Sequence, residues 1–259
     1  MKSQLSIVEK RAISSKNLQN RLNLNKKLGT KDLSEWLFKR YKINKGDKIL
    51  ELGCGIGDHV IKESSLVGTK GFILATDYSK KSLKLLKKKI KNKNVEAKCI
   101  PMDDIINLLS YKKIKFNKII SSYALYYAKN PLKVIKSSSF FLKKNGFFLI
   151  TAPCYPHTLT EFALSQKTLP KIAKKYIDFS QKNLEKFLNK KKIKFKSYNF
   201  KNTLKFKDEN DLLDFYRSTV FYDKKSEKSL SRIFRKSKKR VGYFNILKSA
   251  KLYKFKYIS

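Results

Sequence analysis

The sequence lacks the features that mark membrane proteins, disulfide-rich secreted proteins and metalloproteins. No run of 18 apolar residues occurs among its 259 residues, and the N-terminal residues lack the apolar core of a signal peptide. Its three cysteines, Cys54, Cys99 and Cys154, are far apart and odd in number, which fits a reducing compartment. With only His59 and His157 besides, no metal-ligand spacing is present. These absences predict a cytoplasmic protein with no membrane partner and no metal site.

Arginine is scarce in a chain that is otherwise strongly basic. Only 7 of the 61 cationic residues are arginine, and the formal net charge is +41. Basic surfaces attract phosphate backbones, but phosphate recognition usually favours the forked guanidinium group. The charge is also spread along the chain, since residues 1–155 hold 33 Lys or Arg against 11 acids and residues 156–259 hold 28 against 9. Abundant Lys, Asn, Ile, Phe and Tyr favour a bias of the whole composition over a dedicated nucleic-acid surface.

One short stretch combines a buried-strand pattern with three closely spaced glycines. Residues 48–52 are apolar apart from the flanking Lys48 and a single acid, as expected of a parallel strand buried on both faces. Gly53, Gly55 and Gly57 follow directly, and a helix can begin after them. Glycines here let a ligand approach the backbone, and a helix N-terminus presents free N–H groups. The pattern indicates a nucleotide-type ligand site, with a plain strand-to-helix turn as the alternative.

A second apolar run, residues 72–77, ends in Asp77, which lies 24 residues after Gly53. In a βαβ unit, an acid at the tip of the second strand lies beside the first glycine turn. It can accept hydrogen bonds there from both hydroxyls of a ribose. The spacing therefore predicts that Asp77 and the glycine turn form one site.

Strands and helices alternate through the first 155 residues. Further strands are expected at 95–101, 116–122 and 147–152, the last after a turn at Asn145 and Gly146. Amphipathic helices are expected at 32–41, with Trp36 as a core anchor, at 79–93, and from Pro131 onward. This alternation predicts a doubly wound, mostly parallel sheet.

The last hundred residues are expected to complete that sheet. Helical patterns cover 176–188, 208–219 and 224–240, strand-like pieces cover 195–200 and 203–206, and a period-two pattern covers 251–257. The final pattern suits a closing antiparallel strand. Because no repeat or Gly/Ser-rich linker occurs, a single domain over residues 1–259 is predicted.

Five segments together resemble the class I S-adenosylmethionine-dependent methyltransferases of the small-molecule type, in the order and spacing typical of that family. The segments are residues 50–57, 75–79, 102–103, 116–125 and 146–153. The resemblance covers residues 30–155 well and the remainder more loosely. It implies a Rossmann-like sheet of seven strands whose last strand is antiparallel. Residues 30–155 are then expected to form the cofactor-binding core and residues 156–259 a substrate-side insertion with sheet completion. The polar, weakly periodic residues 1–29 are expected to form a helical lead-in or a partly disordered arm.

The family's cofactor is S-adenosyl-L-methionine, and the resemblance assigns roles to individual residues. The three glycines would wrap its methionine part, Asp77 its ribose and Asp103 its adenine amino group. The glycine that usually precedes the adenine-binding acid is Met102 here, so the choice between Asp103 and Asp104 stays open. The full expected cofactor set is Glu51, Gly53, Cys54, Gly55, Gly57, Asp77, Tyr78, Asp103, Asp104 and Ser121.

The acceptor should face the ends of the fourth and fifth strands. The expected pocket residues are Tyr123, Tyr126, Tyr127, Cys154, Tyr155 and His157. His157 and Tyr123 are the candidates for a catalytic role, although a solvated loop histidine is an equally good interpretation of His157. Residues 121–124 lack the Pro-Pro-aromatic run of base-amino methyltransferases. Cys154 follows a proline, as in cytosine C5 enzymes, but a pocket-lining thiol is favoured over a nucleophile.

These observations predict an S-adenosylmethionine-dependent methyltransferase that acts on a small molecule or a glycan-type metabolite. An RNA methyltransferase is the first alternative, with its cationic face at residues 236–240 on a basic helix. A methyltransferase-fold binding module without turnover is the second. The intact glycine turn and Asp77 argue against decay of the cofactor site.

Overall fold

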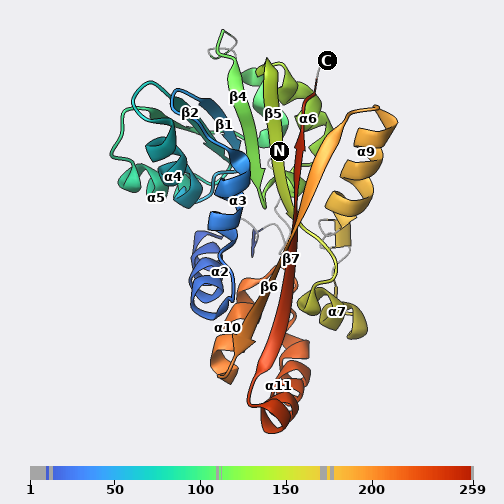
Figure 1. The fold of residues 1–259 in the computed structure, drawn as a ribbon. Helices are drawn as coiled ribbons and strands as arrows, with labels where there is room; N and C mark the ends of the chain where they lie inside the picture. The colour runs from blue at the N-terminus through green and yellow to red at the C-terminus, as the bar shows by residue number, and fades with distance from the viewer. Residues whose placement is uncertain are drawn as a thin grey trace, which may run out of the picture. The chain divides into compact units, whose positions relative to one another are not determined.

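The seven strands of the computed structural model form one sheet in the order β3-β2-β1-β4-β5-β7-β6, with six strands parallel and β7 antiparallel (Figure 1). The structure describes residues 10–11, 14–108, 111, 113–169, 174–175 and 178–257. The predicted Rossmann-like sheet with an antiparallel last strand is confirmed. Among the described residues, no helix is both long enough and apolar enough to cross a membrane.

The elements follow one another as the alternating pattern predicts. The strands are β1 (Lys48–Leu52), β2 (Phe72–Asp77), β3 (Val95–Cys99), β4 (Phe116–Ser122), β5 (Leu142–Pro153), β6 (Phe195–Phe206) and β7 (Phe244–Phe255). The longer helices are α2 (Ser15–Leu28), α3 (Leu33–Tyr41), α4 (Asp58–Val67), α5 (Lys80–Lys89), α6 (Pro131–Ser139), α7 (Thr158–Ser165), α9 (Glu185–Lys190), α10 (Glu209–Ser218) and α11 (Glu227–Val241). Short helical turns are η1 (Met102–Asn107), η3 (Leu125–Tyr127), η4 (Phe179–Leu184) and η5 (Lys224–Ser226).

The chain divides into two compact units, each built from three stretches of sequence. The sheet unit holds residues 34–152, 179–199 and 251–259, and the second unit holds the remainder. Strands β6 and β7 contribute residues to both units. The single domain over residues 1–259, with its boundaries at 29 and 155, stays a prediction.

The sheet unit follows the hydrophobic pattern of the sequence. β1 pairs with β2 on one side and with β4 on the other, both parallel. Helix α4 packs on β2, and α5 packs on β2 and β3. In α5, Leu83 and Leu86 are buried, and Ser79 caps the helix by accepting a hydrogen bond from the Ser82 amide at 3.2 Å.

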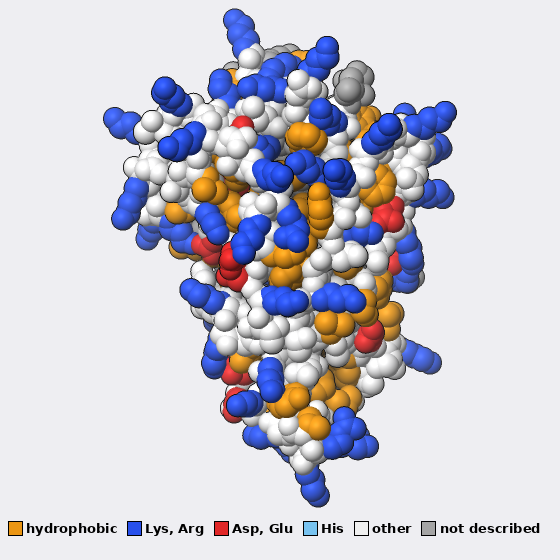
Figure 2. Space-filling view, viewed as in Figure 1, with side chains coloured by type: hydrophobic (Ala, Val, Ile, Leu, Met, Phe, Trp, Pro, Cys, Tyr) orange, Lys and Arg blue, Asp and Glu red, His pale blue; other side chains and the backbone are white. Residues whose placement is uncertain are grey.

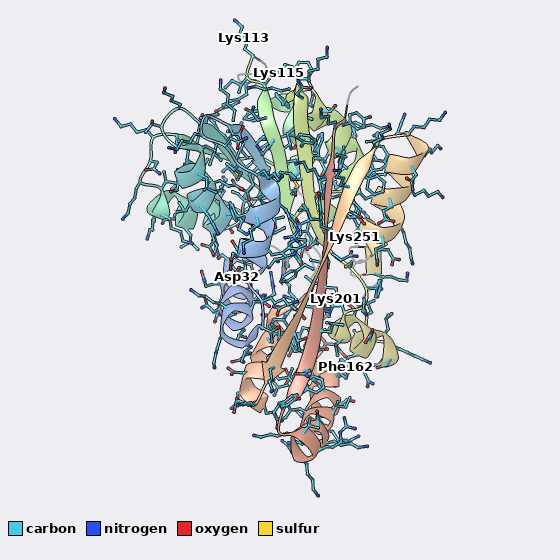
Figure 3. All side chains as sticks on the ribbon, in the orientation of Figure 1. Asp32, Lys113, Lys115, Phe162, Lys201 and Lys251 are labelled. Carbon is cyan, nitrogen blue, oxygen red and sulfur yellow. The ribbon has the colours of Figure 1, made fainter. Side chains whose placement is uncertain are left out.

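Helix α9 and the turn η4 are attached to the last strand by contacts of Lys251 and Tyr253. Glu185 of α9 pairs with Lys251 at 2.5 Å and accepts a hydrogen bond from the Tyr253 hydroxyl at 2.6 Å; Figure 3 labels Lys251 on β7. The same hydroxyl lies 3.0 Å from the Ser180 carbonyl oxygen of η4. Of the helix predicted at 176–188, residues 176–177 lie outside the described part of the chain.

Three strands are longer than the sequence pattern predicts. β5 begins at Leu142, so Gly146 lies inside the strand rather than in a turn before it. The ladder with β4 shifts register between Phe116 and Lys118, which accommodates the extra residues of β5 as an irregularity. β6 is one continuous strand rather than two pieces, and β7 begins at Phe244. Pairing with neighbouring strands therefore extends these strands beyond their local apolar patterns.

Trp36 is not the core anchor that the sequence suggested. The buried residues of α3 are Leu37, Phe38 and Tyr41, whereas Trp36 is partly exposed. The Arg40 guanidinium lies 4.0 Å from the centroid of the Trp36 ring. The indole therefore serves as a surface for a cation on the outside of the helix.

The second unit has its own apolar core around α10. Its buried residues are Leu159, Phe162, Leu204, Phe206, Leu212, Phe215, Tyr216, Leu230, Phe234 and Ile246. Asp208 caps α10, since its carboxylate accepts hydrogen bonds from the amides of Asn210 and Asp211. At the other end of this helix, Arg21 and Arg11 donate to the carbonyl oxygens of Ser218 and Thr219, where cations are favourable.

Candidate active site

The loop after β1 requires glycine at three alternate positions. Gly53, Gly55 and Gly57 have φ angles of +76°, +56° and +83°, in the left-handed region that L residues with side chains rarely adopt. A Cβ added to Gly53 would lie 2.4 Å from the Cβ of Ala124, and one added to Gly57 would lie 2.2 Å from Leu86 Cδ1. The loop therefore has a left-handed backbone at its glycines and is tightly packed against Ala124 and Leu86 of the same unit.

Hydrogen bonds tie this loop to the end of β2. The amides of Gly53 and Cys54 donate to the Thr76 carbonyl oxygen at 2.8 and 2.9 Å. The Gly55 amide donates to Asp77 Oδ2, and the Ser79 amide donates to Asp77 Oδ1, both at 2.7 Å. The structure thus brings Asp77 beside the glycine loop, as its spacing predicts.

The Asp77 carboxylate keeps capacity to accept further hydrogen bonds. Each of its oxygens receives one N–H bond, and a carboxylate oxygen can accept more than one. Burial raises the pKa of Asp77, while the Ser79 and Gly55 amides oppose that shift. The residue therefore combines a role in holding the loop with free lone pairs for hydroxyl donors.

Glu51 lies next to a second buried acid, Glu63, which the sequence analysis overlooked. Glu51 is 2 % exposed in β1 and Glu63 is fully buried in α4. Burial raises the pKa of Glu51 to about 7, and it raises that of Glu63 well above its ordinary value, with the charge of Glu51 adding to the shift. Glu63 shares the buried face of α4 with Val60 and Val67, and this helical spacing was the available signal.

We expect the variant Glu63→Gln to be more stable than the wild-type protein at high pH. A carboxyl whose folded-state pKa is raised keeps a proton that the unfolded chain releases above about pH 4.5, so stability falls as pH rises from there toward 7. Wild type should lose stability between pH 5 and pH 8, and Glu63→Gln should lose less. We expect the two losses in the free energy of unfolding to differ by on the order of 2 kcal/mol.

Urea unfolding at pH 5 and pH 8 measures this effect. Glu35→Gln is the matched control, because Glu35 is exposed on α3 and forms a surface ion pair with Lys39 four residues later. If the free energy of unfolding depends on pH equally in wild type and Glu63→Gln, the buried Glu63 does not lower the stability of the protein at high pH.

On the adenine side of the expected site, the two adjacent acids differ. Asp103 accepts hydrogen bonds from the amides of Lys129 at 2.9 Å and Asn130 at 3.0 Å, so its carboxylate holds the segment before α6. Asp104 is exposed, and Tyr78 is 52 % exposed directly after Asp77. Asp104 and Tyr78 therefore present free surface, whereas Asp103 is engaged with backbone.

Ser121 and Cys54 are placed differently from the cofactor contacts expected of them. Ser121 is 1 % exposed, and its hydroxyl donates to the Leu52 carbonyl oxygen at 3.0 Å. Cys54 is 8 % exposed, and burial raises the pKa of its thiol well above the ordinary value. Because both side chains are packed inside, they support the end of β1 and the loop, and their role as cofactor contacts stays a prediction.

Three tyrosines follow β4 in the sheet unit. Tyr123 has a φ of +54°, which is strained for a bulky residue, and its amide donates to the Thr151 carbonyl oxygen at 2.9 Å. The rings of Tyr126 and Tyr127 lie 4.6 Å apart, and Tyr126 also lies 6.3 Å from Phe179. The chain thus holds Tyr123 in an unfavourable backbone conformation at the end of a parallel strand, where ligands bind in such sheets.

The other three expected pocket residues lie in the second unit. Cys154 is buried, and its amide donates to the Ser249 carbonyl oxygen at 3.1 Å, while Tyr155 is partly buried. His157 is 8 % exposed, and burial together with the Lys248 cation lowers its pKa to about 3. Such a weakly basic, buried imidazole is poorly suited to accept a proton near neutral pH, so the structure does not support His157 as a general base.

Comparison with known proteins places the chain in a family. A family model described as a methyltransferase domain matches residues 43–192, which is more than half of the chain. A ubiquinone/menaquinone biosynthesis C-methyltransferase UbiE from Wigglesworthia glossinidia brevipalpis is 33% identical over 41% of this chain and 43% of its own length. The UbiE protein of Francisella philomiragia is 31% identical over 57% of this chain and 54% of its own. The chain thus spans about half the length of the curated relatives it matches.

Solved structures share the fold at low sequence identity. A protein from Bacillus halodurans C-125, provisionally assigned as a methyltransferase, covers 86% of this chain and 97% of its own with a TM-score of 0.64 and 14% identity. An arsenic(III) S-adenosylmethionine methyltransferase from Chlamydomonas reinhardtii covers 83% of this chain and 65% of its own with a TM-score of 0.52 and 11% identity. These likenesses concern the fold alone. On the family match, the chain belongs to the methyltransferase-domain family, whose cofactor is S-adenosylmethionine.

Proposed function

We propose that the protein transfers a methyl group from S-adenosylmethionine to a small-molecule acceptor. The observation that carries this proposal is the joined pair of the left-handed glycine loop and Asp77, which together fit the cofactor's amino-acid and ribose parts. The loop from Gly53 to Gly57 would take the methionine part, and the Asp77 carboxylate would accept from the ribose hydroxyls. When bound, the cofactor supplies a methyl group activated by a sulfonium.

The adenine would then lie near the exposed side chains that follow β2 and β3. Tyr78 offers an aromatic face, and Asp104 offers a carboxylate that no backbone amide among the described residues occupies. Asp103 retains a further lone pair on each oxygen, so it stays the alternative for the adenine amino group. Ser121 and Cys54 act as supports of this site.

The names of the curated relatives support a quinone-type acceptor, since they are C-methyltransferases of ubiquinone and menaquinone biosynthesis. A glycan-type metabolite is the second acceptor class. Methyl transfer from a sulfonium depends chiefly on alignment of the two reacting atoms. In this proposal Tyr123 lies against the acceptor, because its strained backbone conformation needs a functional reason.

Methyl incorporation from radiolabelled S-adenosylmethionine tests the proposal. Three acceptors are tested: a short-chain demethylmenaquinol, a mixture of sugars as glycan-type acceptors, and total RNA. Each is incubated with the wild-type protein and with the variant Tyr123→Asn. Asparagine tolerates a positive φ, so this variant removes the ring and keeps the backbone. We expect label in the quinol, reduced at least tenfold by the variant. Label in RNA alone would overturn the small-molecule assignment, and cofactor binding without label in any acceptor would favour a binding module.

A further inference from the structure

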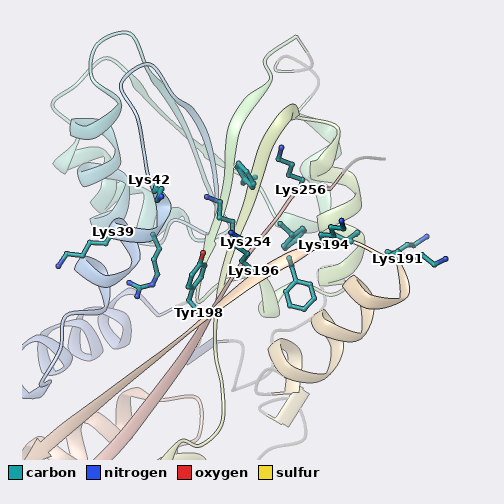
Figure 4. A pocket seen from close by; sticks show the side chains of 14 residues that line it. Lys39, Lys42, Lys191, Lys194, Lys196, Tyr198, Lys254 and Lys256 are labelled. Carbon is teal, nitrogen blue, oxygen red and sulfur yellow. The ribbon is translucent and has the colours of Figure 1, made fainter.

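A groove on the sheet unit concentrates positive charge beyond what the basic composition supplies. Its volume is about 990 Å³ (Figure 4). It is lined by the end of α3, the middle of β5, the segment around the start of β6 and the end of β7. Nine of its 14 lining residues are Lys or Arg and none is acidic. In the whole chain 61 of 259 residues are cationic and 20 are acidic, so evenly spread lysines do not account for this lining.

The cations of the groove are crowded and almost unpaired. Burial lowers the pKa of Lys254, and the charges of Lys118, Lys42 and Lys196 lower it further. Within the described part of the chain, Lys39 is the one lining cation with an ion pair, to Glu35 at 2.8 Å. Such an accumulation of like charge is unfavourable without a counter-charge, so the groove is suited to an anionic ligand.

Aromatic rings lie among these cations. The amino groups of Lys254 and Lys256 lie 4.4 and 5.2 Å from the centroid of the Phe147 ring. The Arg40 guanidinium lies 5.7 Å from the Tyr198 ring, and its buried Nε has no hydrogen-bond partner among the described residues. Figure 2 likewise shows exposed hydrophobic side chains surrounded by Lys and Arg over the strands of this unit. Interleaved rings and cations are typical of surfaces that hold single-stranded nucleic acid.

The groove is distinct from the glycine loop. Phe147 pairs with Lys118 of β4, which pairs with Ile49 near the start of β1, whereas the loop follows the other end of β1. The groove therefore lies toward the amino ends of these parallel strands. A ligand in the groove would leave the cofactor loop unobstructed.

We propose that this groove binds a single-stranded RNA segment, with its phosphates on the lysines and its bases against Tyr198 and Phe147. Nine cations exceed the charge of a single phosphate or of a free nucleotide. A membrane surface fits less well, because membrane-docking faces are flat with protruding aromatic rings, whereas this groove is concave and its rings are recessed. The predicted α11 face at residues 236–240 has exposed cations on one helix, and none of those residues lines this groove. This binding goes beyond methyl transfer and does not depend on it.

Fluorescence anisotropy with a labelled 12-nucleotide oligouridylate at about 150 mM salt tests the proposal. The groove variant carries Lys194→Gln, Lys196→Gln and Lys256→Gln. The control variant carries Lys236→Gln, Lys238→Gln and Lys239→Gln on α11, where the same number of exposed charges is removed. We expect the groove variant to bind at least tenfold more weakly, with a salt slope smaller by about 2, and the control to change less than threefold.

Further binding measurements distinguish RNA from other anionic ligands of the groove. Tyr198→Ala should weaken oligouridylate binding and leave binding of inorganic polyphosphate unchanged, because only the bases stack on the ring. Equal losses in the groove and α11 variants would overturn the proposal, as would tight binding of ATP or of phosphatidylglycerol vesicles without RNA binding. Cofactor affinity of the groove variant, measured by calorimetry, should equal that of wild type. Because RNA binding and cofactor binding are measured separately, a failure of the RNA proposal is distinguished from a failure of the methyltransferase proposal.

Discussion

Asp77→Ala should weaken S-adenosylmethionine binding at least 100-fold. In the proposed site this carboxylate accepts two ribose hydroxyl donors, and hydrogen bonds to a charged group contribute about 1.5–3 kcal/mol each. The same carboxylate holds the loop, since the Gly55 and Ser79 amides both donate to it at 2.7 Å. The variant therefore loses ligand contacts and the arrangement of the loop together.

Calorimetric titration of the cofactor measures this loss. Asp58→Ala is the matched control, because Asp58 lies in the first turn of α4 and pairs with Lys89 on the surface at 2.6 Å. Asp77→Asn should fall between wild type and Asp77→Ala, since an amide keeps one acceptor oxygen. Unchanged affinity in Asp77→Ala would show that the ribose is bound elsewhere.

Gly55→Val should abolish detectable cofactor binding while the fold persists. A β-branched residue at a φ of +56° is strained, and relieving that strain moves the amide that donates to Asp77. The added side chain would also occupy space that the bound cofactor's backbone contacts need. Calorimetry gives the loss of binding, and thermal unfolding gives the cost to stability.

Two other glycines separate function from folding in this experiment. Gly46 has a φ of +80° and open space around an added Cβ, so Gly46→Val imposes similar backbone strain away from the loop and should leave cofactor affinity intact. Gly53→Val should lower the melting temperature more than Gly55→Val, because its Cβ would overlap Ala124. A collapse of stability in Gly55→Val equal to that in Gly53→Val would mean that Gly55 serves the fold and not the ligand.

The cofactor half of the molecule was largely predictable from local sequence. β1, β2 and β4 have the bounds that their apolar runs indicate, because strands buried on both faces show a continuous apolar pattern. Asp77 lies beside Gly55 because consecutive strands of a βαβ unit pair in parallel and end at the same edge. The local apolar pattern is sufficient to predict the strand bounds, and the geometry of one βαβ unit is sufficient to place Asp77 beside Gly55.

Burial and long-range pairing were decided only by the tertiary structure. The sequence left His157 as either a catalytic candidate or a solvated loop histidine, but burial removes the imidazole from solvent and lowers its pKa. The pKa of Glu63 is raised by burial, and the charge of Glu51, which only the tertiary structure brings close, adds to the shift. β5 was extended by its pairing with β4.

The cationic groove shows the same division most clearly. Its lining comes from residues 39–42, 147, 191–198 and 254–256, which are separated by up to about two hundred positions and carry no shared motif. The sequence by itself determined that the chain is rich in lysine and which residues form the glycine loop. Only the folded sheet could decide which lysines meet around the rings of Phe147 and Tyr198, because strand order and register, and not spacing along the chain, set which side chains become neighbours.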